Sequence, residues 1–99
     1  MSTVIPLVRD TRRSVAPGHR RVAAIDIGSN SIRQIVADVS AEGAIQVVDE
    51  MKAAPRLAAG LASTGALADT SIRAAIEALE RMATLARQLG AERIDAVAT

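Results

Sequence analysis

The chain has 99 residues, with 12 basic and 11 acidic side chains, no aromatic residue and no cysteine. This length fits one small domain or part of a larger one, and the lack of cysteine excludes a disulfide framework and a thiolate metal site. Residues 1–21 carry five arginines and one aspartate, whereas residues 22–99 carry seven basic and ten acidic groups. A mildly acidic folded part argues against nucleic-acid binding, and no apolar run approaches the ~18 residues of a membrane span. We therefore expect no nucleic-acid partner, no membrane insertion and, because a cysteine-free chain is compatible with a reducing compartment, a cytoplasmic location.

The N-terminal stretch, residues 1–20, mixes Pro, Gly, Ser, Thr and Arg without sustained periodicity. This composition predicts a flexible basic tail, with an Arg-rich transit peptide as the alternative. His19, the only histidine, falls in this stretch, so we expect no catalytic or metal-binding role for it. The folded part is expected to be residues 21–99.

Three strands are predicted next. Residues 22–27 are a nearly continuous apolar run, typical of a central strand covered on both faces. Residues 32–39 are rich in β-branched side chains and predict a second strand, and residues 44–51 predict a third after a hairpin turn at 41–43. Because both links are short, these three strands should be antiparallel neighbours.

Residues 52–67 contain Pro55, Gly60 and Gly65, which predict an irregular connection. A helix should follow, with Asp69 or Thr70 capping its start and Gly90 ending it. Its apolar residues recur at spacings of three and four and form one stripe: Ile72, Ala75, Ile76, Leu79, Met82, Ala83, Ala86 and Leu89.

Residues 93–99 read as the beginning of a fourth strand. Since a helical crossover precedes it, this strand should lie parallel to an earlier one, and we expect the first strand. An apolar strand at the chain end would leave an unprotected sheet edge. The sequence is therefore expected to be a fragment of a longer polypeptide.

The link between the first two strands has the composition of an anion-binding loop. It consists of four small residues that let backbone N–H groups approach an anion closely: Gly28, Ser29, Asn30 and Ser31. Asp26 precedes the loop, and a carboxylate there would repel phosphate unless a divalent cation bridged the two, which suggests Mg²⁺. No GxxxxGK[ST] motif is present, and an ordinary hairpin turn is the alternative interpretation.

The string AIDIGSNSIR at residues 24–33, followed by Arg56-Leu57, Gly60-Leu61, Gly65 and Leu67, resembles the exopolyphosphatase / guanosine pentaphosphate phosphatase (Ppx/GppA) family. The match keeps order and spacing from about residue 22 to residue 99, and Val97-Ala98-Thr99 resembles the start of the family's A-T-S-A-x-R segment. D-x-G alone would indicate only the superfamily of actin, sugar kinases and heat-shock-chaperone ATPases. The resemblance implies an α/β, ribonuclease-H-like partial domain, with residues 21–99 forming part of the first lobe.

The family hydrolyses the terminal phosphoanhydride of inorganic polyphosphate, or the 5′-γ-phosphate of guanosine pentaphosphate, with Mg²⁺ in a cleft between two lobes. By this resemblance, Asp26 would lie near the metal, and Arg33 and Arg56 would bind phosphate charge. The phosphate loop would be Gly28, Ser29, Asn30 and Ser31. Such roles suit phosphoryl transfer, which depends on positioning and on neutralising oxygen charge.

Other parts that the resemblance implies lie beyond Thr99. They are the general-base glutamate, the second phosphate loop and the whole second lobe. Members of the family often dimerise through their C-terminal lobe. We therefore expect no catalytic residue within these 99 residues, no useful hydrolase activity from them alone, and a full protein that is a candidate homodimer.

The sequence departs from the family pattern at Gln34, where an apolar residue is usual, and at Ala59, where an acid is common. Arg33 has a solvent-facing strand position as its alternative, and Arg56 has a solvated loop charge as its alternative. Lys52 is expected to be only a solvated loop charge. Two other functions remain open. One is a non-catalytic module that binds polyphosphate or a guanosine nucleotide, and the other is a sugar-kinase or chaperone-type ATPase.

Overall fold

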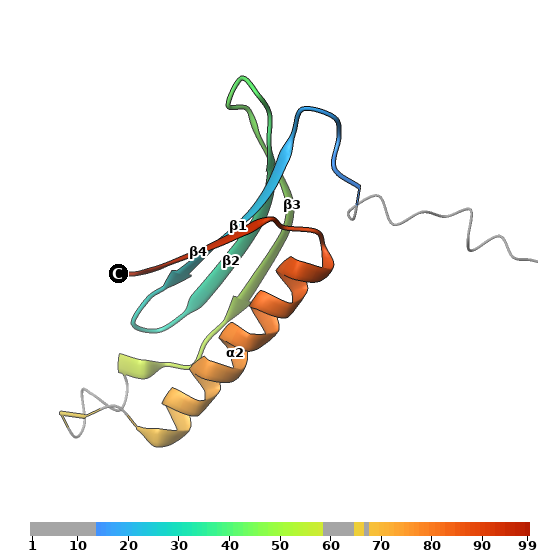
Figure 1. Cartoon of the computed structure of the whole chain (residues 1–99). Helices are drawn as coiled ribbons and strands as arrows, with labels where there is room; N and C mark the ends of the chain where they lie inside the picture. Colours follow the sequence, from blue (N-terminus) through green and yellow to red (C-terminus); the bar gives the residue numbers. More distant parts are fainter. Residues whose placement is uncertain (1–13, 59–64, 67) are drawn as a thin grey trace, which may run out of the picture.

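The computed structural model describes residues 14–58, 65–66 and 68–99, and within them one four-stranded sheet with a helix against it (Figure 1). The predicted Ala59 departure and the Gly60-Leu61 motif lie outside the described residues. The strand order across the sheet is β3-β2-β1-β4. The elements are β1 (Arg20–Ile27), β2 (Ile32–Val39), β3 (Ile45–Ala53), α2 (Asp69–Gln88) and β4 (Arg93–Ala98).

The sheet is mixed, as the short and long links of the chain predict. β1 pairs antiparallel with β2, and β2 pairs antiparallel with β3, whereas β4 lies parallel to β1 after the crossover through α2. The expected partner of the fourth strand is thus confirmed. The β1–β2 loop, the segment that follows β3 and the C-terminal end of β4 all lie at one end of the sheet, opposite the β2–β3 hairpin (Figure 1).

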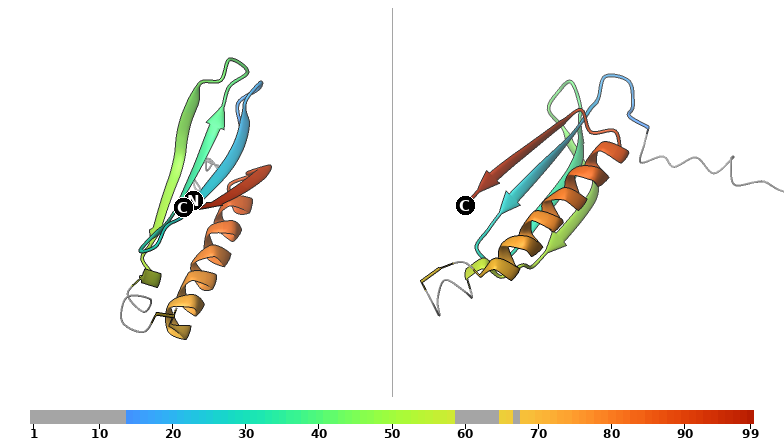
Figure 2. Two further views of the ribbon diagram at one scale, coloured as in Figure 1. Left: turned by 90° about the vertical axis from the view of Figure 1, so that its left-hand side faces the viewer. Right: turned by 60° about the horizontal axis from the view of Figure 1, so that its bottom comes forward.

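The helix α2 packs against one face of the sheet (Figure 2). Alternate residues of β1 and β2 point toward it, and Ala23, Ile25, Ile32 and Val36 are buried there with Met82 of the helix. β1 is central, as expected, but the described residues do not cover its second face: Ala24 and Asp26 are exposed. The prediction of cover on both faces is therefore wrong within the described part of the chain.

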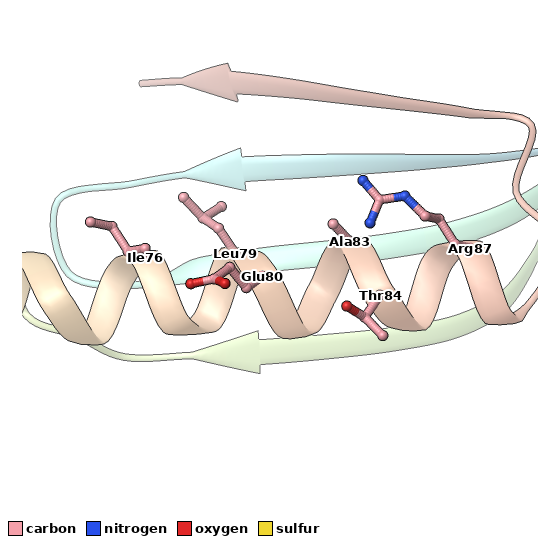
Figure 3. Close-up of a pocket in the computed structure, with 6 residues that line it drawn as sticks. All are labelled: Ile76, Leu79, Glu80, Ala83, Thr84 and Arg87. Atoms are coloured by element: carbon pink, nitrogen blue, oxygen red, sulfur yellow. The ribbon is translucent and has the colours of Figure 1, made fainter.

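The apolar stripe of α2 is only partly in the core. The helix buries the small residues Ala75, Ala78 and Ala86 around Met82, which lets its backbone approach the sheet closely. Ile76 is 51% exposed, and Ile72 is also exposed, so the core uses only part of the predicted stripe. Ile76 belongs to a shallow hollow of about 360 Å³ along one flank of the helix (Figure 3), lined by Ile76, Leu79, Glu80, Ala83, Thr84 and Arg87.

The two ends of α2 are capped differently. Ala68 occupies the N-cap without a side-chain hydrogen bond, so the predicted cap by Asp69 or Thr70 is wrong; the Asp69 carboxylate instead lies in the first turn, where the helix dipole favours it. Gly90 ends the helix as predicted, with φ of 87°, while its N–H donates to the Arg87 carbonyl.

No helix among the described residues is long and apolar enough to cross a membrane.

An ion pair joins Arg21 of β1 to Asp38 of β2. Arg21 is 2% exposed, and its guanidinium donates to both carboxylate oxygens of Asp38 at 2.7 and 2.9 Å. It also donates to the carbonyls of Leu89, at the end of α2, and of Ser14. Arg20, which the sequence placed in the tail, is the first residue of β1 and pairs with Glu92 at the surface.

We expect this ion pair to make folding stability depend on acid. Hydrogen bonds from Arg21 hold the pKa of the Asp38 carboxyl below its ordinary value of 3.8. Because the folded-state pKa is the lower one, the stabilisation is fully present above the ordinary value and is lost as the pH falls through the folded-state pKa. Melting curves from neutral pH into the acid range should show Asp38→Asn with a lower melting temperature at neutral pH and a weaker acid dependence. Equal acid slopes in variant and wild type would contradict the assignment.

Candidate functional site

The loop between β1 and β2 is a tight turn. The Gly28 N–H donates to the Ser31 carbonyl at 2.8 Å, which closes the loop directly before β2 begins. A Cβ at Gly28 would lie 3.1 Å from that carbonyl oxygen, so a larger residue would fit only if the carbonyl shifted slightly. Ser29 and Asn30 at its tip are exposed. The predicted loop residues therefore form one compact turn with an exposed tip.

The segment after β3 is attached to this loop. The Arg56 N–H donates to the Asn30 carbonyl at 3.3 Å, and the Ala58 N–H donates to the Ser29 carbonyl at 2.9 Å. Arg56 has φ of 56°, the one positive value among the described residues other than glycine. This conformation costs on the order of 1–3 kcal/mol, and such strain is concentrated at binding and catalytic sites.

Arg56 and the loop share a hollow of about 380 Å³ at this end of the sheet. The predicted residues Asn30, Ser31 and Arg56 line it together with Lys52 and Ala54. Lys52 was expected to be a solvated charge in the connection that starts at residue 52, and this is wrong, because β3 continues to Ala53 and pairs Lys52 with Arg33. Gly28 and Ser29 shape the loop but do not line this hollow.

Asp26 and Arg33 lie elsewhere, on the sheet face that α2 leaves uncovered. They are direct cross-strand partners in β1 and β2, and both are exposed. They line a second hollow, of about 410 Å³, with Val97 and Thr99. The Thr99 hydroxyl donates to the Asp26 carboxylate at 3.2 Å, and the Thr99 N–H donates to the Ile27 carbonyl. No role was predicted for Thr99, although its position in a family motif directly after β4 was the available signal.

The residues present fit a metal ion that is held partly by the protein and partly by bound substrate. They do not fit a site in which protein ligands alone surround the metal. No group of three or more His, Cys, Asp or Glu side chains comes together in the part of the chain that the structure describes. Mg²⁺ is commonly held by one or two carboxylates, substrate phosphates and water. Asp26, with a hydroxyl beside it and the loop one residue away, offers one such carboxylate.

Gln34 lies directly beneath the site, between β2 and α2. Its side chain is fully buried, and Nε2 donates to the Met82 carbonyl at 2.9 Å. Oε1 is buried without a partner among the described residues. The amide at this normally apolar position is therefore accommodated by one hydrogen bond to the helix backbone.

The mixed sheet, its crossover helix and the tight loop of small residues after β1 place the chain among the ribonuclease-H-like, actin-like α/β domains, of which it forms a part. Within that class, the chain belongs to the Ppx/GppA phosphatase family, whose sequence profile matches residues 35–99.

Individual relatives agree with this assignment. Exopolyphosphatase 2 of Mycobacterium tuberculosis is 42% identical over 82 residues, which cover 80% of this chain and 26% of that protein. The crystal structure of the Aquifex aeolicus Ppx/GppA family member superimposes with a TM-score of 0.75 at 32% identity, over 81% of this chain and 26% of that one. An exopolyphosphatase from Cytophaga hutchinsonii shares the fold, with a TM-score of 0.71 at 18% identity over 80% of this chain and 25% of that one. The chain spans about a quarter of the length of these relatives.

Proposed function

We propose that this chain forms part of the first lobe of an enzyme that releases the terminal phosphate of inorganic polyphosphate. The observation that carries the proposal is the hollow in which Asn30 and Ser31 of the loop meet the cations of Lys52 and Arg56. Two backbone hydrogen bonds hold the loop and the Arg56 segment together, so the hollow is built before substrate arrives. Family membership supports a phosphatase reaction.

Each residue then has a physical task. Loop N–H groups and the Ser29, Asn30 and Ser31 side chains donate to phosphate oxygens, and Arg33 and Arg56 offset their negative charge. Asp26 holds Mg²⁺, and Thr99 orients the carboxylate by donating to it. The bound ion supplies neutralisation of the charge that builds up on the phosphate oxygens.

The remaining groups come from outside the 99 residues. We propose that the chain from Arg20 onward belongs to one lobe and that the residues before it form a basic tail. We also propose that a glutamate beyond Thr99 acts as general base. The second lobe would complete the cleft. On this account the 99 residues alone release no phosphate, because neither the base nor the opposite wall is present.

The proposed function is tested by measuring orthophosphate release in the full-length polypeptide that carries these residues. Long-chain polyphosphate with Mg²⁺ is expected to give steady release, and chelation with EDTA should abolish it because the site then lacks its cation. Guanosine pentaphosphate and ATP, the latter with and without sugars, are the comparison substrates. Turnover of ATP alone would favour an ATPase or kinase, turnover of guanosine pentaphosphate alone would move the substrate to the nucleotide, and binding without turnover would indicate a non-catalytic module.

A further inference from the structure

Lys52 connects two hollows that otherwise share no residue. It lines the loop hollow with Asn30 and Arg56, and it also lines a neighbouring hollow of about 300 Å³ with Arg33 and Glu50. Arg33 in turn lines the hollow of Asp26. The shared residues join the three hollows into one track across the uncovered sheet face, with the charged side chains of Arg56, Lys52, Arg33 and Asp26 along it.

A β-bulge determines that Lys52 takes this place. The β2–β3 register shifts by one residue between Val36 and Ala37, so that Arg33 pairs with Lys52. Without that shift, the register of the hairpin would put Met51 opposite Arg33 and turn Lys52 toward the helix. The shift instead lets Met51 pack against the core and leaves Lys52 exposed.

Two like charges directly opposite each other in a sheet are unfavourable. Lys52 and Arg33 are such a pair, and no carboxylate among the described residues forms an ion pair with either, although Glu50 lines the hollow between them. The strained Arg56 adds a third cation nearby. A bound polyanion would relieve this repulsion.

We propose that Lys52 binds a non-terminal phosphate of a linear polyphosphate chain, as a determinant of affinity for longer chains. Lys52, Arg33 and Asp26 are successive partners on adjacent strands, so Lys52 and Asp26 start about 10 Å apart. A chain of several linked phosphates can span the distance from Asp26 to Lys52 more readily than a single phosphate held at Asp26. The inference rests on the proposed function and adds a subsite to it.

The test compares Lys52→Gln with Lys52→Arg in the full-length enzyme, using Arg81→Gln as the matched control. Arg81 is an exposed cation on α2 and lines none of the hollows of the track. Lys52→Gln should raise KM for long-chain polyphosphate about fivefold, the usual weight of one exposed charge contact. Inhibition by orthophosphate should weaken less than the affinity for long chains, because a single phosphate held at Asp26 lies about two strand spacings from Lys52. Lys52→Arg should keep most of the affinity.

High salt supplies a second readout that a merely structural role would not change. Screening should shrink the difference in KM between wild type and Lys52→Gln, since the lost contact is ionic and exposed. An unchanged KM in Lys52→Gln, or equal weakening of orthophosphate and long chains, would overturn the proposal. If wild-type enzyme releases no phosphate from polyphosphate, the proposed function itself fails; normal wild-type turnover with an unaffected variant removes only the Lys52 subsite.

Discussion

Asp26→Asn in the full-length polypeptide is expected to lower phosphate release from polyphosphate on the order of a thousandfold, because losing a metal contact of about 4 kcal/mol in the transition state corresponds to that factor. Asparagine keeps the size of the side chain and removes its charge. The Asp26 carboxylate is exposed and accepts a hydrogen bond from the exposed Thr99 hydroxyl, so the fold should not depend on it. Steady-state release with Mg²⁺ in excess measures the effect.

Asp95→Asn is the matched control for this substitution. Asp95 is an exposed carboxylate on β4, opposite Ala24 of β1, and its partner is the exposed Arg93. The Asp95→Asn variant should retain nearly full activity, since Asp95 lines none of the hollows of the track. Thr99→Val should cost far less than Asp26→Asn, because the carboxylate remains. Wild-type rates in Asp26→Asn, with an unchanged melting temperature, would rule out the metal-binding role.

Arg21→Met is expected to destabilise the fold by about 3 kcal/mol, or roughly 15 °C in melting temperature. Methionine fills part of the space, but it leaves the largely buried Asp38 carboxylate and the Leu89 carbonyl without their donor. Breaking one side of a buried ion pair is costly because the remaining charge stays out of water. Urea unfolding of wild type and variant measures the difference.

Arg93→Met provides the comparison for Arg21. The pair of Arg93 with Asp95 has side chains that are 67% and 55% exposed, so its loss should change stability by less than about 1 kcal/mol. The double change of Arg21→Met with Asp38→Leu should recover part of the stability, because no unpaired charge is left. Equal effects of Arg21→Met and Arg93→Met would contradict the role given to the buried pair.

Local patterns predicted most of the fold. β2 has the predicted bounds, and the short links and the crossover predicted both antiparallel pairings and the parallel β4. The exposure of Ile72 and Ile76 has a geometric cause: helical periodicity shows an apolar stripe but cannot tell which part of it a narrow sheet will cover. Arg20 was grouped with a basic tail by composition, since its partner Glu92 is distant in the sequence.

The candidate site was predicted in part. The loop could be found because Gly28 and its small neighbours are recognisable as residues, and Arg56 because of its place in a motif. Lys52 could not be predicted in this way. Its position opposite Arg33 depends on a β-bulge, and no residue type in the sequence indicates that bulge. Thr99 likewise meets Asp26 only through the parallel pairing of β4 with β1.

Amide chemical shifts of the β1–β2 loop, recorded while Mg²⁺ and tripolyphosphate are added to the full-length polypeptide, give the most direct test of phosphate binding. The account predicts that the amides of Gly28, Ser29, Asn30 and Ser31 shift together and saturate, that Asp26→Asn weakens the response, and that resonances along the exposed flank of α2 stay in place. If the four loop amides do not move, or if only those of α2 do, the loop is an ordinary turn and the site proposed for it does not exist.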